Sequence, residues 1–358
     1  MIRILFVDDE PDLLRGLKRA FRSKRKEWDM SFAEGGAEAL EIMAENPADL
    51  VISDMRMPEM DGATLLEEIQ KRYPLTVRFI LSGQADEDST LRAVGVSHQF
   101  WAKPCDLEKL EAMITKLFLL REELKPETWH VMNAIQACPS PHHVTRNLTQ
   151  ELDGDETDLE AVTKIVAGDV SLSAKLIQLT NSAYFGTGNY VLVPGQAVRL
   201  LGLETMRNLV KKEGFWSEID QSLGAVDIFQ QMSIAADIGE RVGLKIGMSE
   251  KDWSLARQVC KFFMLAPMLE KSTIIKDVNL DDGRYLAALW GFPDALLEYL
   301  SMEKLLNSNE DLPVFARAVL AMVFPEFAAK CDLEDPTLVI FVREIERARA
   351  EEIGGGDD

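Results

Sequence analysis

The stretch VISDMRMPEMDG, residues 51–62, decides the fold of the first part of this 358-residue chain. Its apolar lead is typical of a strand buried on both faces, and that strand ends on the carboxylate of Asp54. A charged group at the end of a buried strand is costly unless it has a partner or a chemical task. Pro58 and Gly62 are expected to shape the loop that presents Asp54.

Further strands are predicted on both sides of this one in the sequence. Dense or β-rich apolar runs predict five strands in all, at 2–7, 29–32, 51–54, 77–81 and 99–102. Segments of helical period separate them, and a helix over 106–124 follows the last strand. Right-handed crossovers then build a doubly wound, five-stranded parallel sheet, in which functional groups belong at the carboxyl ends of the strands.

The periodicity changes at Lys125-Pro126, where the residue before proline is pushed out of the helical region. Beyond it, helix-length segments alternate with Pro, Gly and Asp, and few alternating strands are visible. The chain is therefore predicted to be α/β plus all-α, with a first domain at 1–123, an all-helical domain at 124–345 and a frayed tail at 346–358.

Charge limits the classes of partner. The chain has 39 Lys+Arg against 60 Asp+Glu, a formal net charge of -21. Residues 1–125 hold 18 basic and 24 acidic residues, a net charge of -6, which leaves -15 for residues 126–358. Such a field repels phosphate backbones and anionic lipid, so neither nucleic-acid nor membrane binding is predicted. The basic run at 22–26 is interpreted as a solvated helix end.

The compartment follows from cysteine usage and from the absence of targeting patterns in the sequence. Four widely separated cysteines form no CxxC pair, which favours reduced thiols. The start, MIRILFVDDE, does not have the pattern of a secretory signal, and no apolar run reaches about 18 residues. A cytoplasmic protein is expected.

A cluster of acids is predicted at one edge of the sheet. Asp8 and Asp9 follow the strand 2–7, so their carboxylates are expected to converge with that of Asp54. Mutual repulsion would force protonation unless a cation is bound, and oxygen ligands of this kind suit Mg²⁺, leaving one carboxylate to act as a nucleophile. Helix capping would explain Asp8, Asp9 and Asp12, but it does not explain Asp54.

Two further groups are expected at the same edge. Ser82 ends the strand 77–81, and Lys103 follows the strand 99–102. A hydroxyl and an ammonium at this position are suited to holding phosphoryl oxygens. The sequence thus predicts a phosphoryl-transfer site built on Asp54.

These motifs, FVDDEP, VISDMRMPEMDG, ILSGQ and FWAKP, resemble the response-regulator receiver domain of two-component signalling over about residues 1–123. The resemblance implies that Asp54 accepts a phosphoryl group from a sensor histidine kinase. It implies a Mg²⁺ site formed by Asp8, Asp9, Asp54 and the backbone carbonyl of Arg56. It also implies that Ser82 and Phe100 form a switch pair, in which the aromatic side chain follows the hydroxyl. Receivers commonly dimerise, and the sequence leaves a homodimer open.

The second domain resembles the HDOD domain, an all-helical relative of the HD phosphohydrolases, over about residues 127–340. The resemblance rests on the segments 169–186 and 196–210 and on WGFP at 290–293. HD enzymes use a His-Asp doublet with outlying ligands to hold a metal-activated water. That doublet is missing, because Met264 and Leu265 stand in its place and none of His130, His142 and His143 is followed by Asp. Asn181 and Ser182 are expected to end a helix.

Three hypotheses remain. The favoured one is a phosphorylation-gated response regulator whose non-catalytic helical domain binds a downstream protein of unknown identity. The alternative is a receiver-gated, metal-dependent phosphohydrolase acting on cyclic dinucleotides or nucleotides. A transcription factor is least favoured, because no basic recognition helix is present and the second half is acidic.

Overall fold

The computed structural model describes most of the chain in several ranges. They are residues 1–83, 92–135, 139–154, 156–181, 191–211, 215–219, 249–266 and 282–307, with single residues and pairs between 237 and 347.

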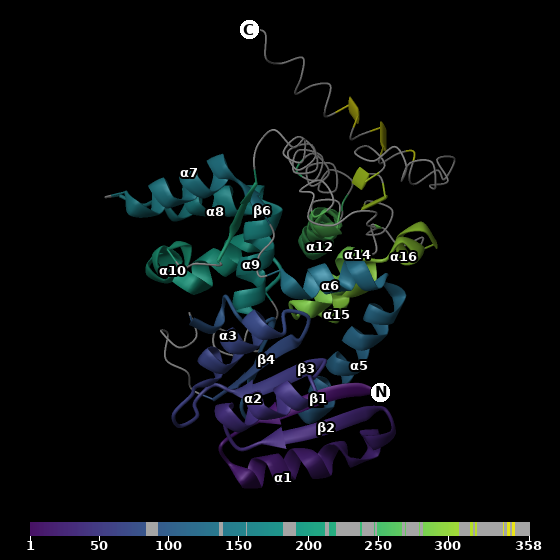
Figure 1. Ribbon diagram of the computed structural model, residues 1–358. Helices are drawn as coiled ribbons and strands as arrows, with labels where there is room; N and C mark the ends of the chain where they lie inside the picture. Colours follow the sequence, from purple (N-terminus) through teal and green to yellow (C-terminus); the bar gives the residue numbers. More distant parts are fainter. Residues whose placement is uncertain are drawn as a thin grey trace.

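The first domain is built on a parallel sheet, and its five predicted strands are confirmed (Figure 1). The strands are β1 (Ile2–Val7), β2 (Trp28–Ala33), β3 (Leu50–Asp54), β4 (Val77–Ser82) and β5 (Gln99–Ala102). Their order is β2-β1-β3-β4-β5, so β3 lies at the centre and β5 at one edge. Every residue of β3 is buried, as expected for a strand covered on both faces.

Helices cover both faces of this sheet, as a doubly wound fold requires. They are α1 (Pro11–Ala20), α2 (Gly36–Glu45), α3 (Gly62–Arg72) and α5 (Leu107–Glu123). Alternate strand residues separate the two sides: Ile52 packs in a cluster with residues of α1 and α5, whereas Val51 packs in a cluster with residues of α2 and α3.

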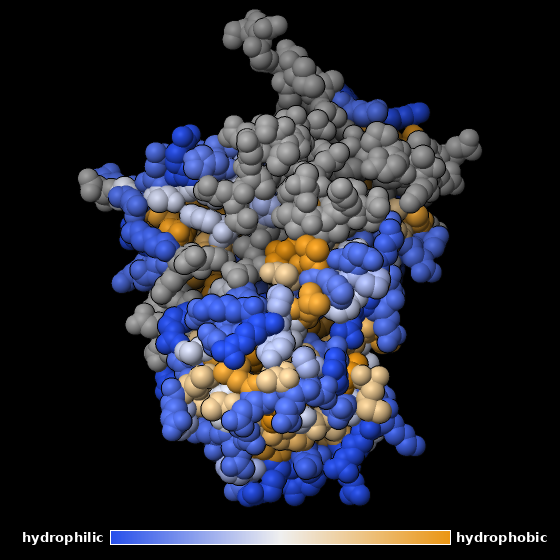
Figure 2. All heavy atoms as spheres, in the orientation of Figure 1, coloured by the Kyte–Doolittle hydropathy of each residue, from blue (hydrophilic) through white to orange (hydrophobic). Residues whose placement is uncertain are grey.

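The surface around α1 is hydrophilic. The basic run forms a short 3-10 helix, η1 (Phe21–Lys26), in which Arg22, Arg25 and Lys26 are exposed. The face shown in Figure 2 is hydrophilic in this region. This agrees with the interpretation of the run as a solvated helix end.

The predicted boundary coincides with a change of helix. Leu124 is extended, and α6 (Pro126–Ala134) begins at Pro126, which occupies the first turn where proline is tolerated. The helices that follow are α7 (His142–Asp153), α8 (Leu159–Gly168), α9 (Val170–Thr180), α10 (Pro194–Val210), α12 (Glu250–Phe262), α14 (Asp282–Leu289), α15 (Asp294–Tyr299) and α16 (Met302–Asn307).

Two features of this helical domain differ from the sequence prediction. A pair of three-residue parallel strands, β6 (Pro139–Pro141) and β7 (Ser217–Ile219), lies among the helices. The predicted helix over 196–210 is interrupted at Gly202, whose φ of 75° and ψ of 162° are not helical. An apolar stripe at helical spacing does not reveal such a kink, because the stripe continues on both sides of it.

The hydrophobic core is continuous between the two domains. One cluster of buried residues includes Phe79 of the sheet, Ile114 of α5, Met132 of α6 and Leu286 of α14. In Figure 1, α6 and α14 lie close to α5, and α14 contacts both of these helices. The helix α9 has all eleven of its residues buried. The helical domain is thus packed against the sheet domain through an apolar interface.

Candidate functional site

Asp54 lies at the carboxyl end of the central strand, in a buried position with 6% of its surface exposed. Its Oδ2 accepts a hydrogen bond of 2.7 Å from the backbone N–H of Arg56. Its Oδ1 forms an ion pair with Lys103. Both carboxylate oxygens therefore have a donor, which is the condition for keeping a buried carboxylate ionised.

Lys103 bridges Asp54 to a second carboxylate. Its Nζ donates to Asp8 Oδ2 at 2.6 Å, and Asp8 Oδ1 accepts from the backbone N–H of Glu10 at 2.9 Å. Asp8 is 1% exposed. The structure thus brings together three of the predicted site residues, although they lie up to 95 positions apart in the chain.

Burial and charge act in opposite directions on this pair. Burial raises the pKa of Asp54, and the hydrogen bond and positive charge of Lys103 offset this only in part. Burial lowers the pKa of Lys103, but the hydrogen bonds and charges of Asp54 and Asp8 outweigh it and leave that pKa raised. Lys103 therefore stays protonated and, together with the N–H of Arg56, favours the ionised form of Asp54.

The loop after Asp54 needs a glycine at position 62. A Cβ on Gly62 would lie 2.1 Å from the carbonyl oxygen of Asp54. The N–H of Gly62 also donates to the carbonyl of Met55 at 2.9 Å, which brings the loop back onto the strand end. Glu59, just after Pro58, has a positive φ of 62°. The expected role of Pro58 and Gly62 in presenting Asp54 thus has a steric basis at Gly62.

The remaining predicted residues lie at or near this edge. Ser82 is the last residue of β4, is 4% exposed and pairs with Ala102 in the ladder. Phe100 is 9% exposed and lies on the neighbouring β5. Asp9 is exposed. Among the described residues, no three His, Cys, Asp or Glu side chains form a metal-binding group, and Asp8 and Asp54 instead share Lys103.

The residues of this edge fit a hard divalent cation. Asp8 and Asp54 are buried carboxylates whose two negative charges are opposed by the single positive charge of Lys103. The exposed Asp9, next along the chain, adds a third negative charge. All the side-chain donors are oxygens, the ligand type that Mg²⁺ prefers.

The residues singled out in the helical domain have mainly structural surroundings. Met264 and Leu265 are 1% and 0% exposed, so both lie in the core of the helical domain. His142 and His143 begin α7, and His130 packs edge-on against Trp129 with ring centroids 4.0 Å apart.

Asn181 ends α9, as the sequence predicted. Its side-chain amide donates to the carbonyl of Val191 at 2.8 Å, and its side-chain oxygen accepts from the N–H of Val191 at 2.7 Å. Ser182 lies outside the described residues.

Sequence reasoning missed a set of buried polar residues between the domains. These are His98, Gln99, Asn133, Lys175 and Gln178. A signal was available for two of them, because Lys175 and Gln178 interrupt an otherwise apolar segment, and polar groups on a buried helix need partners. Those partners lie in the other domain, so the sequence did not identify them.

Family comparisons agree with this geometry. Residues 4–115 match the response regulator receiver domain, and residues 138–256 match the HDOD domain. The chain therefore contains a receiver domain followed by an HDOD domain, and its class is that of a two-component response regulator.

Curated relatives match part of this chain. The response regulator protein PilR of Pseudomonas aeruginosa is 31% identical over 40% of this chain and 32% of its own length. The regulatory protein AtoC of Escherichia coli is 29% identical over 42% of this chain and 32% of its own length. The sensor kinase CckA of Brucella abortus is 36% identical over 32% of this chain and 12% of its own length. This chain thus spans about a third or less of the length of these relatives.

A solved receiver structure is also similar to the first domain. It comes from an HD domain-containing protein of Pseudomonas fluorescens, with 29% identity over 34% of this chain and 98% of that chain, and a TM-score of 0.32.

Within the described part of the chain, no helix has the length and apolar character needed to cross a bilayer. Cys105 and Cys260 are free thiols.

Proposed function

We propose that this response regulator is phosphorylated on Asp54 in the cytoplasm and that its HDOD domain transmits the signal by binding another protein, without catalysis of its own. The observation that carries the first part is the contact of Lys103 with both Asp54 and Asp8 at the carboxyl edge of the sheet. This arrangement supplies an oxygen nucleophile together with a cation for the incoming phosphoryl oxygens.

The phosphoryl donor we propose is a phosphohistidine of a sensor kinase. The Asp54 carboxylate attacks phosphorus, an O–P bond forms, and the P–N bond of the donor breaks. The Arg56 N–H holds Oδ2 and so orients the carboxylate, while Lys103 favours its ionised form. A Mg²⁺ ion held by Asp8, Asp9, Asp54 and the Arg56 carbonyl would neutralise charge on the transferred phosphoryl group.

We propose that the signal leaves the site through Ser82 and Phe100. The Ser82 hydroxyl, on the strand next to β3, donates to a phosphoryl oxygen. Phe100 lies on the next strand, β5, and its side chain moves into the space that the Ser82 hydroxyl leaves. For the output, the buried apolar side chains at Met264 and Leu265 support a domain without hydrolytic chemistry.

Phosphoryl transfer is tested with a small-molecule phosphodonor and Mg²⁺, followed by the mobility shift of the modified chain. The wild type is expected to be labelled and Asp54→Asn is not. The matched control is Asp49→Asn, which changes a carboxylate immediately before β3, at the opposite end of the strand. Labelling of Asp54→Asn at the wild-type level would contradict the assignment.

The output role is tested by capture from native lysate. The full chain with beryllofluoride and Mg²⁺ is compared with Asp54→Ala as bait. A protein retained by only one of the two supports phosphorylation-dependent binding. Turnover of a cyclic dinucleotide by the purified chain, lost in an HDOD-domain variant, would instead support the phosphohydrolase.

A further inference from the structure

The helical domain binds the receiver at the start of β5 and in the segment just before that strand. β5 is the last strand in the order, and an uncovered edge strand is a template for unwanted pairing. Gln178 Nε2 donates to the carbonyl of His98 at 2.7 Å, and Lys175 Nζ donates to that of Val94 at 3.1 Å. In return, Gln99 Nε2 donates to the carbonyl of Ala288 at 2.8 Å. Side chains of each domain thus bind the backbone of the other.

Asn133, in the connecting helix α6, joins both domains at one point. It is 0% exposed. Its Nδ2 donates to the carbonyl of Leu75 at 2.8 Å, and its Oδ1 accepts from the hydroxyl of Tyr285 at 2.6 Å. Its backbone carbonyl lies 3.0 Å from His98 Nε2. A buried polar network in which each of these atoms has a partner specifies one arrangement, and losing one partner is costly.

The protonation of His98 gives its contact with Asn133 a direction. His98 Nδ1 accepts from the N–H of Arg78 at 3.0 Å, so the ring proton is assigned to Nε2, which donates to the carbonyl of Asn133. Burial, together with the charges of Arg78 and Lys175, lowers the pKa of His98 well below its usual value. The ring is therefore neutral near neutral pH, as this pattern of bonds requires.

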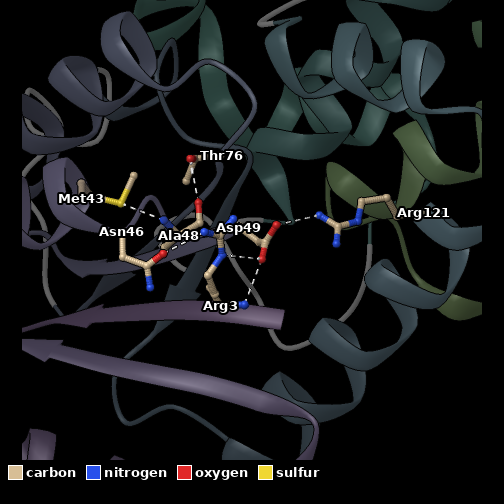
Figure 3. A network of polar contacts seen from close by, with 7 residues as sticks. All are labelled: Arg3, Met43, Asn46, Ala48, Asp49, Thr76 and Arg121. Carbon is tan, nitrogen blue, oxygen red and sulfur yellow. Dashed lines mark hydrogen bonds and ion pairs between the residues drawn. The ribbon is translucent and has the colours of Figure 1, made fainter. Parts of the chain in front are cut away.

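A second contact fixes the other part of α6. The guanidinium of Arg121 lies 4.8 Å from the ring centroid of Trp129. Arg121 also donates to Asp49 Oδ1 at 3.3 Å (Figure 3). Asp49 in turn accepts from the N–H of Arg3 on β1 at 2.9 Å. The connecting helix is thus bound to the receiver at Trp129 and at Asn133, and it is not a free linker.

The docked edge and the phosphorylation site share one short segment. Gln99 begins β5, and Lys103, which contacts Asp54, follows directly after the strand ends at Ala102. The N–H of Lys103 donates to the carbonyl of Ser82 at 2.8 Å. A phosphoryl group on Asp54 would change the ion pair between Asp54 and Lys103, and it would therefore act on the segment that also holds Gln99 and His98.

We propose that Asn133 is the positioning residue of a latch that holds the HDOD domain on β5 in the unphosphorylated protein, and that phosphorylation of Asp54 opens this latch. This inference rests on the proposed function. Opening frees the polar face of α9 that carries Lys175 and Gln178. By linkage, a state that docking disfavours must become easier to phosphorylate when docking is weakened.

The test uses Asn133→Leu in the full chain, a change of similar size that removes both side-chain hydrogen bonds. Tyr285→Phe, which removes one hydroxyl only, is the milder second variant. Hydrogen exchange is measured at 94–102 and 282–289, and the affinity for beryllofluoride with Mg²⁺ is measured in parallel. Asn147→Leu is the control, because Asn147 is exposed on α7 and belongs to neither of the two contacts of α6 described above.

We expect Asn133→Leu alone to exchange as fast in both segments as the wild type does with beryllofluoride, and to bind beryllofluoride about tenfold more tightly. Tyr285→Phe is expected to shift both readouts in the same direction by less. Unchanged exchange and affinity in both variants would overturn the latch. If both variants behave as expected and beryllofluoride still changes no captured protein, the latch stands and the proposed output function fails.

Discussion

At the scale of single residues, Asp54 combines a buried position with a need for ionisation. Burial raises the pKa of its carboxyl, and Lys103 counteracts this only in part. The folded state therefore binds the proton of Asp54 more tightly than the unfolded state does. The contribution of this group to stability accordingly falls as the pH rises through its titration range.

Asp54→Asn removes this titration and is expected to raise the melting temperature at neutral pH. The gain should shrink as the pH falls towards about 4, where Asp54 becomes protonated in both states. Thermal melts of the wild type and of Asp54→Asn across this pH range measure the difference in melting temperature.

The control for this experiment is Asp106→Asn. A hydrogen bond from the backbone N–H of Lys109 lowers the pKa of Asp106, so its contribution is present at neutral pH and is lost in acid. Asp106→Asn should therefore show no gain at neutral pH. A gain for Asp54→Asn that is independent of pH would contradict the stated cause.

Gly62 is the second residue whose identity is set by its surroundings. Gly62→Ala would place a Cβ 2.1 Å from the carbonyl oxygen of Asp54, so the loop must shift. We expect a loss of about 3 kcal/mol in the free energy of unfolding, measured by urea denaturation. Gly16→Ala is the control, since a Cβ there meets nothing within 4 Å and alanine favours the helix by up to about 1 kcal/mol. Equal effects of the two changes would contradict the steric argument.

At the scale of elements, α10 shows a backbone requirement within an apolar stripe. Gly202 has φ 75° and ψ 162°, a conformation that is essentially restricted to glycine, and a Cβ there would contact nothing within 4 Å. Gly202→Ala is therefore expected to lose about 1–3 kcal/mol through the backbone alone. Gly168→Ala is the matched control, because that position is equally open and has no positive φ. Chemical denaturation compares the two, and a neutral Gly202→Ala would show that α10 straightens without cost.

The connecting helix α6 changes how the two domains are understood as elements. The sequence predicted a break at Lys125-Pro126 but no role for the helix after it. In the structure this helix carries Asn133 and Trp129, which bind the receiver directly. A movement of β5 would therefore be transmitted to the HDOD domain through packed and hydrogen-bonded contacts.

At the scale of the whole molecule, the continuous core predicts cooperative unfolding. Residues of the sheet, α5, α6 and α14 belong to one buried cluster. Gly62→Ala, although it lies in the receiver, is expected to lower hydrogen-exchange protection in α14 as well as in β1. Exchange measured segment by segment checks this. Protection that falls in β1 alone would show that the domains unfold independently.

Sequence patterns predicted the receiver well, because its signals are local. Dense apolar runs defined the strands, and the polar residues directly after them defined the candidate site around Asp54. Gly202 and the pair β6–β7 were missed, because neither a single glycine within an apolar stripe nor two three-residue strands alter the helical periodicity.

The sequence by itself determined the order of the elements and the grouping of Asp8, Asp54 and Lys103, since parallel strands bring their carboxyl ends to one edge. Only the tertiary structure decided that Lys103 lies between the two carboxylates. It also decided that Gln99, Asn133 and Gln178 hold the domains together. The Gln99–Ala288 bond joins residues 189 positions apart, and no local period encodes a contact between surfaces that exist only after each domain has folded.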